Sequence, residues 1–360
     1  MDQTDVYESL AGVAGLPQSK FIREVYKRLV TPEESEMLLV LPATVSEFAQ
    51  KFKMNESSAK RKLDEFVAKG VAISRERAGG VVYCNPAHPI QLHDATSYAI
   101  LYEKYKPVQR EVLELWRRFR ETEWFECVRT IEYAGMVPSR VIPLLGSVED
   151  TSGMLPYEDV RAILKDAPAI AVNDCPCRWL RVKEGDCDKP TWTCLHLSPS
   201  TVKFLLDNGL GKKISVDEAY QICDNAVKAG LCPTVSGGGP KVSNICFCCS
   251  DCCVMFRPVV KYGYNLLSKS RYLCTVDSEQ CNGCLICADR CQFGAVETVK
   301  VTGSKELRAS VDIEKCYGCG ACVIGCPTKA MTLKLVRPVE HIPMAPSITA
   351  LDDIEAASLT

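Results

Sequence analysis

The sequence lacks the features by which membrane-inserted, secreted and nucleic-acid-binding proteins are most readily recognised. No apolar run approaches the roughly 20 residues of a membrane-spanning helix. The opening stretch, MDQTDVYESLAGVAGL, has no basic segment followed by an apolar core, so we expect no secretion signal. The net charge is −2 and 24% of the residues are charged, which indicates neither a nucleic-acid nor a membrane partner. We therefore expect a cytoplasmic protein.

Cysteine is scarce at the start of the chain and abundant afterwards. Only Cys84 and Cys127 precede position 175, and the other 20 of the 22 cysteines lie between Cys175 and Cys326. A disulfide framework is typical of short secreted chains, whereas this chain has 360 residues. In a reducing cytoplasm, dense cysteine clusters indicate metal ligands.

The N-terminal part, residues 1–90, reads as a helical module that ends in a hairpin. Two capping boxes, TPEE from Thr31 and TVSE from Thr44, each predict the start of a helix. Asn55 is expected to cap a third helix, with two short strands around Gly79–Gly80 after it. The residues expected on the buried face of this third helix are Ala59, Leu63, Phe66 and Val67. The pattern predicts a winged-helix-like module.

A winged-helix outline is compatible with DNA binding, for which the third helix would present Lys60, Arg61 and Lys62. Acidic residues on the same helix dilute this basic patch, namely Glu56, Asp64 and Glu65. A phosphate-binding face would avoid them. The sequence therefore favours a structural or protein-docking role, and a redox-responsive regulator that uses residues 44–69 remains an alternative.

The next two segments are a helical connector, residues 91–150, and a cysteine-rich α/β domain, residues 151–265. In the connector, a core-facing stripe is expected from Val112, Leu115, Trp116 and Phe119. In the cysteine-rich domain, a short buried strand AIAV runs directly into NDCPCRWL, and the capping box SVDE at 215–218 begins a helix. On that helix Ala219, Ile222, Ala226 and Val227 are expected to face inward, with Cys223 as a packed thiol.

The end of the chain contains an internal repeat with an offset of 35 residues. VDSEQCNGCLICADRCQFGAVE begins at Val276, and VDIEKCYGCGACVIGCPTKAMT begins at Val311. Both copies have the spacing C-x2-C-x2-C-x3-C. The eight cysteines are Cys281, Cys284, Cys287 and Cys291, then Cys316, Cys319, Cys322 and Cys326. A zinc site would instead need two well-separated C-x2-C pairs, so the doubled triplets argue against zinc here.

Residues 270–336 resemble the bacterial two-cluster ferredoxins, in which the fourth cysteine of each run ligates the other cluster. The resemblance implies two [4Fe-4S] clusters. Cluster one would be held by Cys281, Cys284, Cys287 and Cys326, and cluster two by Cys316, Cys319, Cys322 and Cys291. Gln292 departs from the motif because it replaces the proline that follows the fourth cysteine. We expect this change to loosen the first half without removing a ligand.

A second set of cysteines lies in the middle of the chain, around CPCR and CFCCSDCC. The candidate metal ligands are Cys175, Cys177, Cys187, Cys194, Cys246, Cys248, Cys249, Cys252 and Cys253. Adjacent residues such as Cys248 and Cys249 point in different directions, which predicts two neighbouring sites or one site backed by further thiols. Cys223 and Cys274 are expected to be packed thiols, whereas Cys232 is left unassigned.

Three interpretations of the middle cysteines stay open. One or two further [4Fe-4S] clusters are favoured, because they suit a ferredoxin domain and use the most cysteines. A structural zinc site with four thiolates, from a C-x-C and a distant pair, is the second. A thiol–disulfide relay is the third. Arg178, Arg181 and Lys183, beside CPCR, are expected in a solvated basic loop, and docking of an acidic redox partner is the alternative. His196 is expected to be packed or solvated rather than a ligand.

The whole layout is an α+β multidomain chain, and residues 337–360 are expected to form a tail. It resembles ferredoxin-like iron–sulfur proteins of anaerobic bacteria and archaea, through RVIP, LPYEDVR, CPCR, CDKP and CFCCSDCC. The resemblance implies electron transfer to or from a partner oxidoreductase, for example a flavin- or corrinoid-dependent one. An enzyme that reduces a small substrate at the middle site is the alternative, although no flavin, nucleotide or corrinoid pocket is visible in the sequence.

Overall fold

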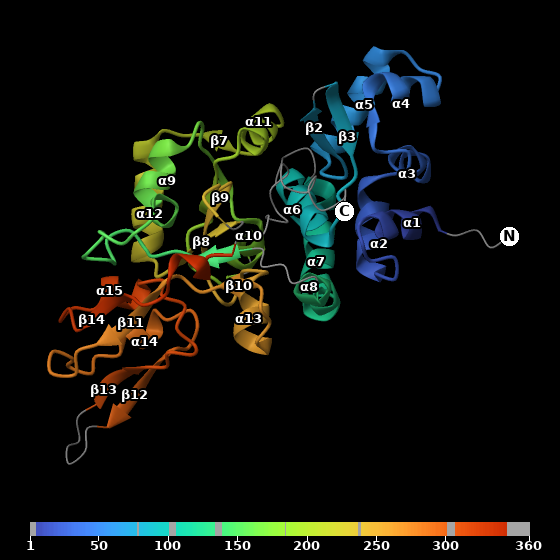
Figure 1. The fold of residues 1–360 in the computed structure, drawn as a ribbon. Helices are drawn as coiled ribbons and strands as arrows, with labels where there is room; N and C mark the ends of the chain where they lie inside the picture. The colour runs from blue at the N-terminus through green and yellow to red at the C-terminus, as the bar shows by residue number, and fades with distance from the viewer. Residues whose placement is uncertain are drawn as a thin grey trace. The chain divides into compact units, whose positions relative to one another are not determined.

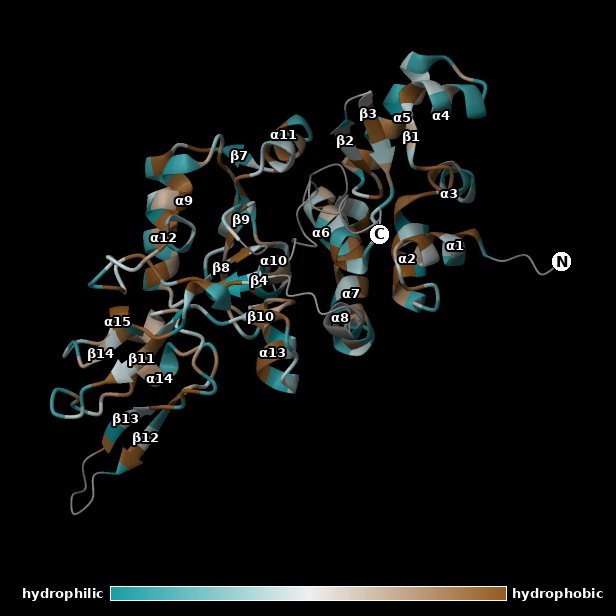
Figure 2. Cartoon of the chain, viewed as in Figure 1, coloured by the Kyte–Doolittle hydropathy of each residue, from teal (hydrophilic) through white to brown (hydrophobic). Residues whose placement is uncertain are grey.

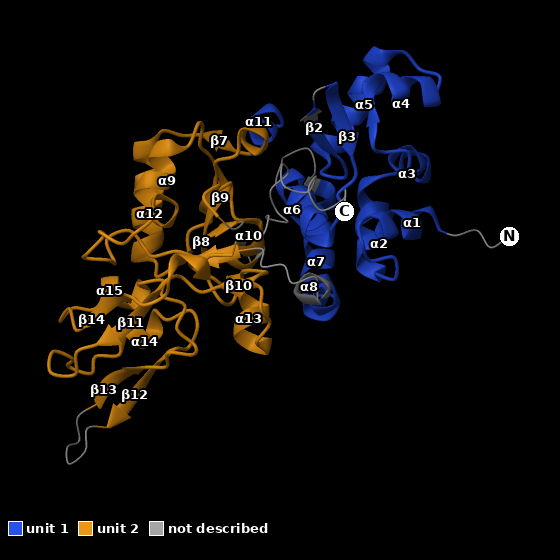
Figure 3. Ribbon diagram, viewed as in Figure 1, with its two compact units in different colours: residues 1–130, 203–210 blue, residues 131–202, 211–360 orange. Residues whose placement is uncertain are grey.

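The computed structural model of the protein is a mixed α/β structure whose helices and strands are labelled in Figure 1. It describes residues 5–77, 79–100, 106–133, 139–183, 185–236, 239–300 and 307–343. The chain divides into two compact units (Figure 3), unit 1 with residues 1–130 and 203–210 and unit 2 with residues 131–202 and 211–360. These units are coarser than the five segments expected from the sequence, whose boundaries stay a prediction. Among the described residues, no helix combines the length and apolarity that crossing a membrane requires.

Unit 1 begins with helices and a small antiparallel sheet. The elements are α1 (Val6–Val13), α2 (Lys20–Leu29), α3 (Pro32–Leu38), β1 (Ala43–Thr44), α4 (Val45–Lys51), α5 (Glu56–Ala68), β2 (Ile73–Arg77) and β3 (Gly80–Cys84). The predicted capping boxes are present at Thr31 and Thr44, and the Asn55 side chain caps α5. The strand order is β1-β3-β2, and β2 and β3 form the expected hairpin. All four residues predicted for the inner face of α5 are buried.

The rest of unit 1 is helical, with α6 (Pro89–Ala99), α7 (Lys106–Thr122) and α8 (Trp124–Tyr133). Of the predicted α7 stripe, Val112, Trp116 and Phe119 are buried, whereas Leu115 is only half-buried and Leu113 is buried in its place. Trp116 and Trp124 both meet the Phe119 ring edge to face, so aromatic packing defines this core.

Unit 2 is built on a seven-stranded sheet with the order β10-β4-β8-β9-β6-β5-β7. All neighbouring pairs are antiparallel except β10 with β4. The strands are β4 (Ser139–Val141), β5 (Ala171–Asp174), β6 (Trp192–His196), β7 (Lys212–Lys213), β8 (Cys232–Ser236), β9 (Asn244–Cys248) and β10 (Leu267–Ser268). Residues 139–141 were expected in a connector, but they form β4 and pair with both β8 and β10.

Helices accompany this sheet in unit 2. They are the 3-10 helix η2 (Pro156–Glu158), then α9 (Val160–Asp166), α10 (Pro176–Lys183), α12 (Val216–Lys228) and α13 (Phe256–Tyr262). The helix α11 (Pro199–Asp207) begins in unit 2, and its residues from Lys203 onward belong to unit 1. In Figure 2, α12 carries hydrophobic and hydrophilic residues on different sides. The predicted capping box opens α12 at Ser215, and Cys223 is fully buried, as expected. Ile222 was expected to face inward but is only half-buried, so Cys223 takes the central core position.

The end of unit 2 repeats one small motif twice. Each copy consists of a strand, a cysteine loop, a short helix and a second strand. The elements are β11 (Tyr272–Val276), α14 (Ile286–Asp289), β12 (Val296–Lys300), β13 (Leu307–Val311), α15 (Ala321–Gly325) and β14 (Met331–Leu335), followed by η3 (Val339–His341). β11 pairs with β14, and β12 pairs with β13. Each of these pairs joins a strand of the first copy to a strand of the second.

A buried ion pair fixes η2 against the start of β11. Arg271 Nη2 lies 2.7 Å from Glu158 Oε2, and the two side chains are only 4% and 2% exposed. The same guanidinium donates to the Gly153 carbonyl at 2.6 Å. The hydrogen bond with Glu158 raises the pKa of Arg271, so the guanidinium stays charged although it is buried.

Glu158→Ala is expected to lower the free energy of unfolding of unit 2 by about 3–5 kcal/mol, because the Arg271 charge would stay buried without its partner. The apparent melting temperature of anaerobically purified protein, followed by circular dichroism, checks this expectation. Glu297→Ala is the matched control, since it removes an exposed pair with Lys315 and should cost less than about 1 kcal/mol. Equal shifts of the melting temperature in the two variants would show that the buried ion pair stabilises the fold no more than the exposed one.

Candidate metal centres

The first C-terminal pocket brings together three cysteines of the first repeat and one of the second. Its lining includes Cys281, Cys284, Cys287 and Cys326, and its volume is about 290 Å³. The backbone N–H of Ala309 donates to Cys281 Sγ at 3.4 Å. Hydrogen bonds to the sulfur atoms are among the features that tune the potential of an iron–sulfur cluster. The grouping is the one that the ferredoxin resemblance implies for cluster one.

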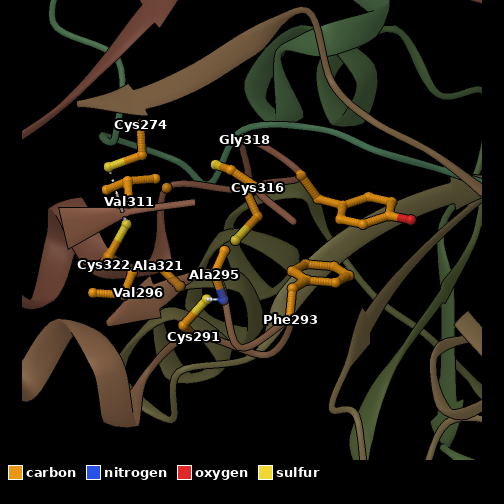
Figure 4. Close-up of a pocket in the computed structure, with 13 residues that line it drawn as sticks. Cys274, Cys291, Phe293, Ala295, Val296, Val311, Cys316, Gly318, Ala321 and Cys322 are labelled. Atoms are coloured by element: carbon orange, nitrogen blue, oxygen red, sulfur yellow. Dashed lines mark hydrogen bonds between the residues drawn. The ribbon is translucent and has the colours of Figure 1, made fainter. Parts of the chain in front are cut away.

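The second pocket has the reciprocal composition. Its lining includes Cys316, Cys319, Cys322 and Cys291, and its volume is about 340 Å³. Figure 4 shows Cys291, Cys316 and Cys322 around this hollow. The Phe293 ring stacks on Tyr317 with centroids 4.2 Å apart, and both rings line the same pocket. The grouping is the one that the resemblance implies for cluster two.

Glycine allows each cysteine loop to fold this tightly. Gly283 has a φ of +70°, and a Cβ there would lie 2.3 Å from the Leu307 carbonyl oxygen. Gly318, its counterpart in the second copy, has a φ of +67°, and a Cβ would lie 2.1 Å from the Tyr272 carbonyl oxygen. No other residue fits at either position without moving the backbone. The hollow pockets and the thiols around them therefore fit two cubane clusters.

The pKa values of the pocket thiols are shifted in both directions, since a hydrogen bond with Cys232 lowers the pKa of Cys319. Burial raises the pKa of Cys287 to about 11, and it also raises the pKa values of Cys291 and Cys316. Because a metal must displace the protons of these thiols, cluster binding is expected to weaken as the pH falls.

Six cysteines of the middle region gather on one side of the large sheet, and we call them the six-thiol group: Cys175, Cys177, Cys194, Cys246, Cys248 and Cys253. Antiparallel pairing places Cys194 of β6 opposite Cys246 of β9, and Cys248 lies two residues further along the same face. The Cys175 thiol interacts with those of Cys177 and Cys194. The Cys253 thiol interacts with those of Cys177 and Cys248. The group thus forms a continuous network of thiols.

The other three middle cysteines lie apart from this network, together with an aspartate. The ligand atoms of Cys187, Cys249, Asp251 and Cys252 all lie within 4.8 Å of one another, and we call these residues the Cys187 group. A hydrogen bond from Cys252, together with the nearby Arg178 charge, lowers the pKa of Cys249. The nine predicted ligands therefore separate into six and three, and their role as metal ligands stays a prediction.

Arg178 is not part of a solvated basic loop, and that expectation is wrong for this residue. Its side chain is 1% exposed and lies between the two thiol groups. Nε donates to Cys249 Sγ at 3.4 Å, and Nη2 donates to the Phe247 carbonyl at 2.7 Å. Nη1 donates to the Pro190 carbonyl at 2.6 Å. A guanidinium has five N–H donors, which suits this buried position among several acceptors. The sequence pattern could not distinguish the buried Arg178 from a surface arginine.

Two cysteines outside the predicted ligand set border the second pocket. Cys274 in β11 is buried, as expected of a packed strand residue, but it also lines the pocket and accepts a hydrogen bond from Cys322 Sγ at 3.3 Å. Cys232, at the start of β8, is fully buried and its thiol hydrogen bonds to Cys319. His196 is buried beside Asn173, with Nε2 3.1 Å from Oδ1, as expected of a packed histidine.

Gln292 does not simply loosen the first repeat. Its side-chain oxygen accepts hydrogen bonds from Ser250 N at 2.9 Å and Ser250 Oγ at 3.2 Å. Its Nε2 donates to the Gly230 carbonyl at 3.0 Å. Ser250 belongs to CFCCSDCC, so the residue that departs from the ferredoxin motif links the C-terminal repeat to the middle cysteines. A proline could form none of these contacts.

The comparison with known families agrees with this geometry at the C-terminus. Residues 280–331 match the family described as the 4Fe-4S dicluster domain. No curated protein is significantly similar to the chain. The chain thus carries a 4Fe-4S dicluster domain within a longer cysteine-rich sequence, which supports iron–sulfur electron transfer.

Gln292→Ala is expected to lower the apparent melting temperature, by the equivalent of about 1–3 kcal/mol, because it leaves the Ser250 N–H and the Gly230 carbonyl without partners. Iron content should stay unchanged, since no ligand is removed. Gln280→Ala provides the control, because Gln280 Nε2 reaches only the exposed Asp277, at 2.7 Å. If both variants have the melting temperature of the wild type, Gln292 does not link the C-terminal repeat to the middle cysteines.

Proposed function

We propose that the chain is a cytoplasmic iron–sulfur electron-transfer protein, which relays single electrons to or from a partner oxidoreductase of an oxygen-sensitive metabolism. The observation that carries the proposal is the pair of pockets that each bring together four cysteines of the segment that matches the dicluster domain. A bound [4Fe-4S] cluster accepts and donates one electron at a time.

Two sets of residues would hold the C-terminal clusters. Cluster one would take Cys281, Cys284, Cys287 and Cys326, and cluster two would take Cys316, Cys319, Cys322 and Cys291. The reciprocal lining of the two pockets supports this cross-ligation. Cys284 is the one exposed thiol among these eight, so a partner could approach cluster one at that ligand.

A third redox centre is proposed at the six-thiol group. The support is its continuity with the pocket of cluster two. Cys232 lies between the two, because its thiol hydrogen bonds to Cys319 of the pocket. The Cys253 thiol of the six-thiol group is also near enough to Cys232 to influence the pKa of Cys232. Six thiols exceed what one cubane needs, which is compatible with a further iron–sulfur centre that has additional thiols beside it.

The N-terminal module is proposed to be winged-helix-like and to dock a protein, namely the redox partner, which we expect to be a flavin- or corrinoid-dependent oxidoreductase. The charge pattern of α5 supports a protein rather than DNA. Lys60 Nζ lies 2.6 Å from Asp64 Oδ2, and Lys62 Nζ lies within 3.0 Å of carboxylates of Glu34 and Glu65. Lysines that are already paired with carboxylates release few counterions from a DNA backbone.

Electron delivery tests the proposal directly. Protein reduced with dithionite and freed of the reductant is mixed anaerobically with ferricytochrome c, a one-electron acceptor. We expect delivery of about two or more electrons per chain, one from each cluster. Delivery of less than about one electron per chain from iron-loaded protein would overturn the proposal.

Double variants test the cross-ligation. Cys281→Ala with Cys326→Ala removes two ligands from one cluster, so about four irons per chain should be lost. Cys316→Ala with Cys326→Ala removes one ligand from each cluster and should cost about eight. Iron analysis of anaerobically purified protein distinguishes them, with Cys223→Ser, a packed thiol of α12, as the control. The opposite ranking would mean that each cysteine run binds its own cluster.

A further inference from the structure

The sulfur and oxygen atoms of the Cys187 group are spaced for a single ion rather than for a cluster. Four thiolates on a cubane bind four separate irons, which keeps their sulfur atoms well apart. Thiolates on one tetrahedral zinc, at about 2.3 Å from the metal, lie about 3.8 Å from each other. The four ligand atoms here all lie within 4.8 Å of one another. Among the described residues, neither the two pockets nor the six-thiol group forms so close a set.

The chemistry of the four ligands favours zinc. Three thiolates and one carboxylate form a tetrahedral set of the kind that Zn²⁺ accepts, and soft sulfur ligands select against magnesium and calcium. Cys249 and Cys252 are buried, Cys187 is half-buried and Asp251 is exposed. The site therefore has three shielded sulfur ligands and one oxygen ligand that faces solvent.

The chain divides its adjacent cysteines between the two groups. Cys248 and Cys253 interact with each other and belong to the six-thiol group, whereas their direct neighbours Cys249 and Cys252 also interact with each other. Cys248 ends β9 and Cys249 follows it, and neighbouring residues of an extended strand point to opposite sides. A turn follows, in which the Cys253 N–H donates to the Cys249 carbonyl at 3.1 Å, so one short stretch can supply two separate sites. The crowding of CFCCSDCC follows from this double use.

Arg178 holds the two loops of the Cys187 group at a fixed separation. One end of its guanidinium donates to the Pro190 carbonyl, three residues after Cys187, and the other donates to the Phe247 carbonyl, two residues before Cys249. Its Nε reaches Cys249 Sγ itself. A buried cation beside these sulfur atoms offsets part of the negative charge of three thiolates and a carboxylate.

We propose that Cys187, Cys249, Cys252 and Asp251 bind one zinc ion, separate from every iron–sulfur site of the chain. The ion would fasten the loop that contains Cys187 to the segment that follows β9. It would thereby hold β9, which carries Cys246 and Cys248, in position beside the six-thiol group. This site differs from a four-thiolate zinc site, because the aspartate takes the fourth position and a C-x-C pair is not used.

Metal analysis of the full-length protein tests the proposal. Anaerobically purified protein is passed through a chelator and gel filtration, and zinc and iron are measured together. We expect about one zinc per chain in the wild type. Cys187→Ser should lose at least about 90% of it, and Asp251→Asn should bind zinc about 10–100-fold more weakly, with iron unchanged in both. Asp188→Asn, an exposed carboxylate of the same loop, should keep its zinc.

Zinc X-ray absorption on the same samples identifies the ligands. We expect three sulfur neighbours at about 2.3 Å and one oxygen at about 2.0 Å. Three results would each overturn the proposal. They are a shell of four sulfur atoms around the zinc, a wild-type protein without zinc, and a Cys187→Ser variant that loses iron instead of zinc. Failure of the electron-transfer proposal would appear separately, as iron-free protein that still contains its zinc.

Discussion

The register of three antiparallel strands, β6, β9 and β8, is the constraint on which the metal sites of unit 2 depend. It places Cys194 opposite Cys246 and Cys232 opposite Cys248, so four thiols from three strands share one face. A shift of one residue would turn every one of these thiols to the other face. The hydrophobic residues between them, such as Ile245 and Leu195, are fully buried and specify that register.

The same register connects the middle of the chain to its end. Cys232, held opposite Cys248, hydrogen bonds to Cys319 of the second pocket. Gln292 and Arg290 add polar contacts to Ser250, Gly230 and Val227. The backbone N–H of Leu144, just past β4, donates to the Cys319 carbonyl at 2.8 Å. The ferredoxin-like repeat is thus packed against the cysteine-rich sheet by thiols, side chains and backbone together.

The sequence predicted what depends on local pattern or on fixed spacing. The capping boxes, the buried face of α5 and the β2–β3 hairpin are short-range features, and the structure has them. The grouping of Cys326 with the first triplet was implied by the resemblance to two-cluster ferredoxins, which the repeated cysteine spacing carries. By contrast, β4 was missed because three residues carry too little periodicity to reveal a strand. The burial of Arg178 and the role of Gln292 depend on partners about 40 to 70 residues away, which no local pattern contains.

Low-temperature electron paramagnetic resonance of the wild-type protein, purified and reduced without oxygen, tests the central claim most directly. If the thiols after position 174 hold iron and sulfide for single-electron transfer, the protein should be coloured in its oxidised state. On reduction it should show a signal of reduced [4Fe-4S] clusters that integrates to about two or more spins per chain. A colourless protein, or a reduced sample without any such signal, would contradict the account.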